Sequence, residues 1–238
     1  MEQFEASYNK VLKTIFSITN PFKKLIIKTQ CEVHKFLNQQ ALLILKNDKY
    51  YREYEFFKKF IKDINEGAVW ADQDYRSSNH FYNPFKKKGL YGRKDALELC
   101  LEYYEEALGY WKKEMVKKSM FYIGAALHLI QDMTVPQHAN IRLLDNHRQY
   151  ENYIKRTYDY MKEFKVDKGT YILDSMEDYI RFNARVAIRI YKHFKDIKDE
   201  EERFYRIARC GLPLAQRTTA GALTIIYKDL FNENLTKN

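Results

Sequence analysis

The stretch that decides the fold is FYIGAALHLIQDMTVPQHAN, residues 121–140. Its apolar residues predict a helix, and the i, i+4 spacing of His128 and Asp132 places both side chains on one face of that helix. Pro136 is expected to end the helix, because proline lacks the N–H and disfavours a helical residue before it. His138 follows directly after this break. Three side chains of metal-ligating types therefore come together within one short segment.

The overall composition favours an all-α protein. Of the 238 residues, 45% are hydrophobic, and only eight are Gly and four are Pro, which argues against a turn-rich sandwich or barrel. The formal net charge of +9 favours contact with an anionic partner such as a membrane surface, a nucleic acid or a phosphorylated substrate. A solvated cationic surface that only aids solubility explains the same charge, because the lysines are spread along the chain.

Helical periodicity recurs along most of the chain, and we expect one compact all-α domain over residues 21–238. Residues 1–20 form a weakly determined lead-in. The segment 67–93 departs from the helical pattern and is expected to be a long metal-binding loop, since long loops in compact domains are usually functional. The last helix is expected to be kinked or interrupted near Pro213. The expected helices cover residues 22–47, 49–64, 95–114, 115–132, 146–164, 171–194 and 199–230.

The cysteines and the apolar runs exclude several classes of protein. Cys31, Cys100 and Cys210 are odd in number and far apart, so we expect buried free thiols rather than a disulfide or a thiolate metal site. No apolar run approaches the length of a membrane span. The first residues lack the basic start and continuous apolar run of a secretory signal.

Further potential ligands lie outside the central stretch. His147 and Glu151 form a second i, i+4 pair, and His34, Asp72 and His80 stand alone. Each has a plain structural explanation when taken separately. A helical His–acid pair is more often an ion pair, a lone histidine is more often a core or turn residue, and a lone aspartate can cap a turn.

Taken together, these residues favour a catalytic zinc site. Nitrogen and carboxylate ligands without thiolates are typical of zinc sites that keep positions open for water. Only six histidines occur in the chain, and five of them fall in these segments. The sixth, His193, has no acidic partner at i±4 and is expected to be structural.

The same segments resemble the bacterial zinc-dependent phospholipase C family, in which a helical His-x-x-x-Asp leads through a proline to a further His and an Asn. Leu129 and Gln131 stand where the family has an aromatic residue and a glycine. No Trp precedes His34, whereas the family completes a third zinc site with an N-terminal Trp. The segments that carry the resemblance are residues 121–140, GAVWAD at 67–72, HFYNP at 80–84, NHRQYE at 146–151 and AQRTTAG at 215–221.

The resemblance implies two or three Zn²⁺ ions per chain. It assigns Asp72, His80, His128 and Asp132 to the first zinc, His138, His147 and Glu151 to the second, and His34 with Asp132 to a third. It also gives Asp72, or a zinc-bound hydroxide, a catalytic role in activating the attacking water. Without the Trp, the third zinc is either absent, weakened, or completed by another group.

The function that the resemblance implies is hydrolysis of phosphodiesters. Phospholipids at a membrane surface would be cleaved by a zinc-activated water to diacylglycerol and a phosphorylated head group, by a monomeric enzyme. One alternative is a zinc nuclease of the same superfamily, with bases stacking on Trp70, Tyr75, Phe81 and Tyr82. The other is a non-catalytic metal-binding module. The family resemblance implies secretion, but without a clear signal peptide a cytoplasmic location stays open.

Overall fold

The computed structural model describes residues 20–73, 79–90, 94–141 and 146–232, with side chains from Glu32 onward. Within these ranges every regular element is a helix, and the single β-bridge joins Asn83 to Lys88, so the all-α prediction is confirmed. Apart from Asn20, the expected lead-in lies outside the described residues. The elements are α2 (Asn20–Asn47), α3 (Tyr51–Lys59), α4 (Ile61–Ala71), α5 (Ala96–Lys112), α6 (Val116–Asp132), α7 (Pro136–Asn140), α8 (His147–Thr157), η3 (Lys162–Phe164), α9 (Met176–Phe194) and α10 (Glu200–Asn232).

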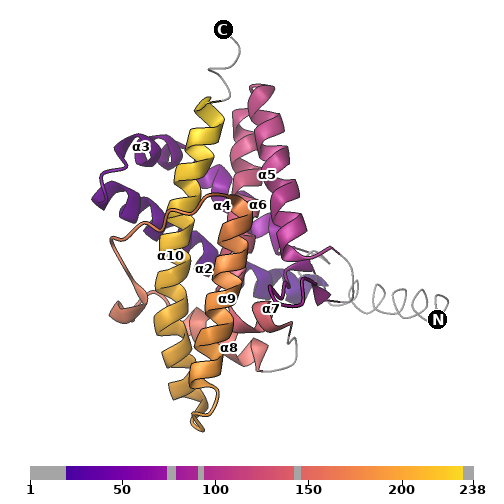
Figure 1. Cartoon of the computed structure of the whole chain (residues 1–238), viewed down its shortest axis with the longest axis vertical. Coiled ribbons are helices and arrows are strands. Elements are labelled where there is room, and N and C mark those ends of the chain that lie inside the picture. Colours follow the sequence, from indigo (N-terminus) through magenta and orange to yellow (C-terminus); the bar gives the residue numbers. More distant parts are fainter. Residues whose placement is uncertain (1–19, 74–78, 91–93, 142–145, 233–238) are drawn as a thin grey trace, which may run out of the picture.

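Helix α6 forms the centre of the core. Helices α4 and α5 pack along it, and α9 and α10 cover it in the view of Figure 1. Residues 123–132 are buried without exception, because this part of α6 has protein on every side. His128, Gln131 and Asp132 belong to this buried run and must therefore find polar partners inside the protein.

Helices α4 and α6 cross with their backbones in contact. A Cβ atom on Gly67 would lie 1.7 Å from the carbonyl oxygen of Phe121, and one on Gly124 would lie 1.9 Å from the carbonyl oxygen of Ile64. Only glycine permits this approach. The predicted helix end near residue 64 and the loop start at Gly67 are therefore wrong, because Gly67 serves a helix crossing rather than a turn and α4 continues to Ala71. The predicted helix over residues 49–64 is also two helices, since α3 ends and α4 begins at Phe60.

The segment after α6 contains a second short helix. Helix α6 ends at Asp132 as predicted, but Pro136 begins α7 instead of leading into a loop. Proline is favoured at the first helical position, where an N–H would have no intrahelical partner and φ is already set. His138, which was expected after a simple break, consequently lies on α7.

Helices α8 and α9 are both shorter than predicted. Helix α8 ends at Thr157, and Phe164 lies in the separate turn η3, where it is buried in a second apolar cluster with side chains of α8 and α10. Helix α9 begins after Ser175, whose hydroxyl accepts the N–H of Asp178 at 3.1 Å. The helix therefore begins at this cap and not at residue 171, which the apolar periodicity predicted.

Helix α10 is continuous from Glu200 to Asn232 with Pro213 inside it. Of the two predicted alternatives, an interruption near Pro213 is therefore wrong, and a kink there stays a prediction. Leu212 and Leu214 on either side of the proline are buried. This packing outweighs the loss of one backbone hydrogen bond at the proline.

Two of the three cysteines can be placed. Cys100 is buried and free, as predicted, but Cys210 is free and exposed on α10, and the side chain of Cys31 lies outside the described part. Among the described helices, none is both long and apolar enough to cross a bilayer.

Asp95 caps α5, and its loss is expected to lower stability. Its Oδ1 accepts the N–H groups of Leu97 and Glu98, both at 3.0 Å. We expect Asp95→Ala to lower the free energy of unfolding by about 1 kcal/mol, and Asp95→Asn, which keeps an acceptor, to lower it less. Urea unfolding followed by circular dichroism measures both variants. An unchanged midpoint for the alanine variant would contradict this role.

Candidate metal centre

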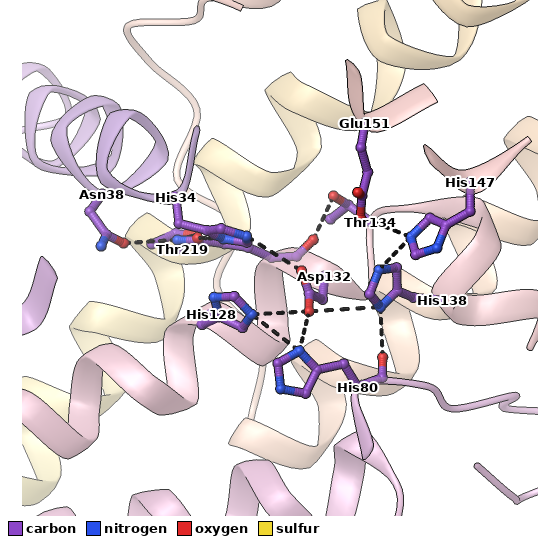
Figure 2. A network of polar contacts seen from close by, with 11 residues as sticks. His34, Asn38, His80, His128, Asp132, Thr134, His138, His147, Glu151 and Thr219 are labelled. Atoms are coloured by element: carbon purple, nitrogen blue, oxygen red, sulfur yellow. Dashed lines mark hydrogen bonds and ion pairs between the residues drawn. The ribbon is translucent and has the colours of Figure 1, made fainter. Parts of the chain in front are cut away.

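All eight predicted ligand residues lie around the C-terminal end of α6, brought there from α2, the end of α4, the segment before α5, and α6, α7 and α8. Figure 2 shows seven of them facing one another. Their potential ligand atoms form three groups, in each of which the atoms lie within 4.8 Å of one another. The groups are His34, His128 and Asp132; Asp72, His80 and His128; and His138, His147 and Glu151.

Asp132 is the centre of the arrangement. Its Oδ2 lies 2.9 Å from Nδ1 of His80 and 3.2 Å from Nε2 of His128, and its Oδ1 lies 3.5 Å from Nε2 of His34. His80 and His128 are also in contact, with 3.2 Å between Nδ1 and Nε2. One carboxylate thus faces His34 of α2 with one oxygen and His80 and His128 with the other. A ligand shared by two metal ions needs such a position.

The third group has its donor atoms aimed at one another. Nε2 of His147 lies 3.0 Å from Nε2 of His138 and 3.0 Å from Oε1 of Glu151. Nδ1 of His138 donates to the carbonyl oxygen of His80 at 2.9 Å, so in the neutral ring Nε2 carries the lone pair. This backbone contact fixes the tautomer that offers Nε2 to a metal.

The segments carrying His80 and His138 are tied to each other. Besides the His138–His80 hydrogen bond, the N–H of Tyr82 donates to the carbonyl oxygen of His138 at 3.2 Å. The ring of Phe81 stacks on His138, with centroids 4.8 Å apart and an interplanar angle of 9°. Phe81 and Tyr82 are buried and therefore not available to stack nucleic-acid bases, as the nuclease alternative would require. Trp70 packs against Tyr103, and Tyr75 lies outside the described residues.

Gln131 is a functional candidate that the sequence did not assign. Its Oε1 accepts Nδ1–H of His34 at 2.8 Å, and its Nε2 donates to Asn38 at 2.8 Å and to Thr219 at 3.2 Å. Asn38 in turn donates to Asn65 at 3.0 Å. This fully paired network holds the His34 ring so that Nε2 faces Asp132. In the sequence, Gln131 differed from its neighbours only in that it stands where the phospholipase C family has a glycine.

Removing the Gln131 amide is expected to weaken metal binding at His34. We expect Gln131→Leu, which keeps the volume but not the acceptor, to lower zinc affinity of one site by about 10- to 100-fold, the usual effect of losing a group that orients a ligand. Competition with a zinc chelator measures the affinity. Gln131→Glu, which restores an acceptor for His34, is the matched control, and equal affinities for the leucine variant and the unaltered protein would contradict the role.

Burial and mutual contacts set the protonation of the cluster. Burial lowers the pKa of His34 and of His138 to about 4, so both rings are neutral and able to ligate a metal near pH 7. Burial alone would raise the pKa of Asp132, but His128 and His138 beside it hold that pKa well below its usual value. Burial alone would lower the pKa of His80, but its hydrogen bond to Asp132 and the charge of that carboxylate outweigh burial and raise the pKa.

The remaining two carboxyls differ. Burial raises the pKa of Asp72 to about 6. Burial acts in the same direction on Glu151, but the hydrogen bond and charge of His147 outweigh it and the pKa of Glu151 lies below its usual value. At neutral pH both are ionised, and Asp72 is the more basic of the two.

The donor set fits zinc. Two ligands bound 2.0–2.2 Å from a tetrahedral zinc ion lie roughly 3.3–3.6 Å apart. The facing ligand atoms lie at similar distances: 3.5 Å between His34 and Asp132, and 3.0 Å from His147 to both Glu151 and His138. Imidazole lone pairs and carboxylates that converge in this way are the arrangement that a bound cation satisfies.

A pocket opens onto the centre. Its polar side includes His34, Asp72, Asp132, His138 and Glu151, which places ligands from all three groups on one cavity. Most of its other lining residues are apolar, namely Val33, Leu37, Val135, Ile154 and Leu212. The cationic side chain of Lys155 also lines the pocket. The cavity therefore joins a polar metal-binding side to an apolar wall.

Comparison with known proteins agrees with this geometry. A family model described as zinc dependent phospholipase C matches residues 33–205, and the chain belongs to this family. Phospholipase C of Clostridium novyi is 26% identical over 235 residues, covering 84% of this chain and 58% of that protein. Phospholipase C of Listeria monocytogenes is 26% identical over 207 residues, covering 79% of this chain and 69% of that protein. The chain thus spans less than two thirds of the Clostridium novyi relative.

Solved structures show the same fold. Alpha toxin from Clostridium absonum superposes with a TM-score of 0.75 and 19% identity, covering 85% of this chain and 64% of that one. Alpha-toxin of an avian Clostridium perfringens strain superposes with a TM-score of 0.70 and 21% identity, covering 87% and 65%. The prediction of a helical domain of the zinc-dependent phospholipase C type is confirmed.

Proposed function

We propose that this protein is a phospholipase C that hydrolyses phospholipids to diacylglycerol and a phosphorylated head group. The observation that carries the proposal is the convergence of three ligand groups on a pocket whose other wall is apolar. The phosphodiester would lie against the ligands and the diacylglycerol part along the apolar wall. The enzyme would act as a monomer at a membrane surface, within one catalytic domain spanning residues 21–238.

We assign the ligands to three zinc positions. The first is held by Asp72, His80, His128 and Asp132, the second by His138, His147 and Glu151, and the third by His34 and Asp132. Zinc, when bound, acidifies water and neutralises charge on the phosphate and on the leaving oxygen. In support of the third position, Oδ1 of Asp132 faces His34 while Oδ2 faces His80 and His128.

Asp72 is the residue proposed to activate the attacking water. It lies on the pocket, and in the metal-free protein, where burial raises its pKa to about 6, it is an ionised carboxylate at pH 7. It would orient the water and take its proton as the water oxygen attacks phosphorus and the bond from phosphorus to the glycerol oxygen breaks. The leaving oxygen then takes up a proton, from Asp72 or from solvent, and becomes the hydroxyl of diacylglycerol.

The test combines zinc analysis of the purified protein with turnover of phosphatidylcholine, a generic phosphodiester and single-stranded DNA. Two or three zinc ions per chain with turnover of the lipid support the proposal. Zinc with turnover of DNA alone would identify a nuclease, and zinc without any turnover would identify a metal-binding module. A protein that binds no zinc would overturn the site as a whole. Size-exclusion chromatography tests the monomer.

A further inference from the structure

A short turn before α5 carries an unusual set of exposed side chains. Phe85 is 64% exposed, and the three residues after it, Lys86, Lys87 and Lys88, are exposed as well. The residues on both sides, 81–84 and Gly89, are buried. Four consecutive residues, one aromatic and three cationic, therefore project from an otherwise buried segment.

The turn is held in a defined conformation. Oδ1 of Asn83 accepts the N–H groups of Phe85 and Lys86, both at 3.0 Å. The N–H of Asn83 donates to the carbonyl oxygen of Lys88 at 2.9 Å, and the N–H of Lys87 donates to the carbonyl oxygen of Asn83 at 2.8 Å. Lys87 adopts a positive φ of 48°, which closes the turn. The exposure of Phe85 is thus a fixed feature of the fold.

The turn is also anchored to the metal centre. Tyr82 donates to the carbonyl oxygen of His138, and Phe81 stacks on the ring of the same residue. Figure 1 shows this part of the chain, between α4 and α5, beside α7. Phe85 is five positions after His80, so their Cα atoms are at most about 18 Å apart. Whatever binds the turn is brought close to the metal centre.

The chemistry of the turn fits an anionic bilayer. Segments that lie at the boundary between head groups and acyl chains place Trp, Phe or Leu toward the acyl chains and Lys or Arg toward the head groups. Lysines close to the surface are attracted by anionic lipids. A single-stranded nucleic acid would require a succession of accessible rings for its bases, whereas the neighbouring aromatics Phe81 and Tyr82 are buried.

We propose that residues 85–88 form a membrane-docking turn, in which Phe85 inserts among the head groups of a bilayer and the three lysines bind its anionic phospholipids. This inference deepens the proposed function and rests on it, because docking matters only if the substrate is a lipid in a membrane. The turn would hold the enzyme on the surface with the metal centre near its substrate, separately from the chemistry of hydrolysis.

The test uses the zinc-loaded protein and vesicles of phosphatidylcholine and phosphatidylglycerol in equal parts that carry a dansyl-labelled lipid. Energy transfer from tryptophan after rapid mixing reports binding before turnover. We expect Lys86→Gln, Lys87→Gln and Lys88→Gln to weaken binding about 5-fold each, and on the order of 100-fold together. Phe85→Ala is expected to weaken it by about tenfold. Hydrolysis of a short-chain phosphatidylcholine kept below its micelle concentration should remain unchanged in all variants.

Matched controls separate this turn from the general positive charge. The triple change of Lys58, Lys59 and Lys62 to Gln removes the same charge from another exposed surface, and Tyr51→Ala removes an aromatic ring that is 58% exposed. Both controls should bind vesicles like the unaltered protein. Equal loss of vesicle binding in a control would overturn the proposal, and so would unaltered vesicle binding in the turn variants. Absence of hydrolysis of the short-chain lipid in the unaltered protein would instead count against the proposed function.

Discussion

His138→Ala and Glu151→Ala are each expected to abolish phosphodiester hydrolysis, lowering kcat on the order of a thousandfold or more. The two residues supply two of the three ligand atoms that converge at His147. Removing either one leaves too few protein ligands to hold a metal, so zinc content should fall by one ion per chain. Helix content should change little, because both side chains project from their helices into the pocket.

His193→Ala is the control for these variants. His193 lies in the last turn of α9, is exposed, and takes part in none of the three ligand groups found among the described residues. Its replacement should leave zinc content and turnover unchanged. Full activity in Glu151→Ala, or an equal loss in His193→Ala, would show that the ligand set is assigned incorrectly.

Gly124→Ala is expected to lower the free energy of unfolding by about 3 kcal/mol or more. The added methyl group would lie 1.9 Å from the carbonyl oxygen of Ile64, and backbone on both sides prevents relief by rotation of a side chain. The helices α4 and α6 would have to separate in the most deeply buried part of the core. Gly67→Ala should have a similar effect, since its methyl group would meet the carbonyl oxygen of Phe121.

Gly109→Ala is the matched control for this crossing. Gly109 lies in α5, and apart from its chain neighbours and the adjacent backbone of α5, no atom of the described residues lies within 4 Å of an added Cβ. Alanine there should raise the free energy of unfolding by about 0.5–1 kcal/mol, because it is the better helix former. Urea unfolding of the three variants gives the comparison. If Gly124→Ala and Gly109→Ala shifted the midpoint of urea unfolding equally, the close contact between the backbones of α4 and α6 would not be the reason for glycine at position 124.

Local spacing was sufficient to predict much of the candidate site. His128 with Asp132 and His147 with Glu151 are one helical turn apart, and the structure places each pair in contact, at 3.2 Å and 3.0 Å. The helix periodicity depends on neighbours within a few residues, so it is present in the sequence itself. The grouping of these pairs with His34 and His80 came from the resemblance rather than from spacing.

Features that depend on distant parts of the chain were missed. Gly67 resembles a helix end locally, and only the backbone of α6 explains why it lies inside α4. Pro213 resembles a helix break, and only buried packing on both sides explains why α10 continues through it. Gln131 acts on His34 across 97 positions of sequence. No local pattern contains these contacts, because tertiary packing overrides propensity.

The reciprocal hydrogen bonds between residues 80–82 and His138 couple the binding of metal at two of the ligand groups. His80 belongs to one ligand group, and its own carbonyl oxygen fixes the ring of His138, which belongs to another. A metal that orders His80 thereby prepares His138, and by thermodynamic linkage the reverse holds equally. The two positions should therefore fill cooperatively, so that a titration with zinc rises more steeply than two independent sites allow.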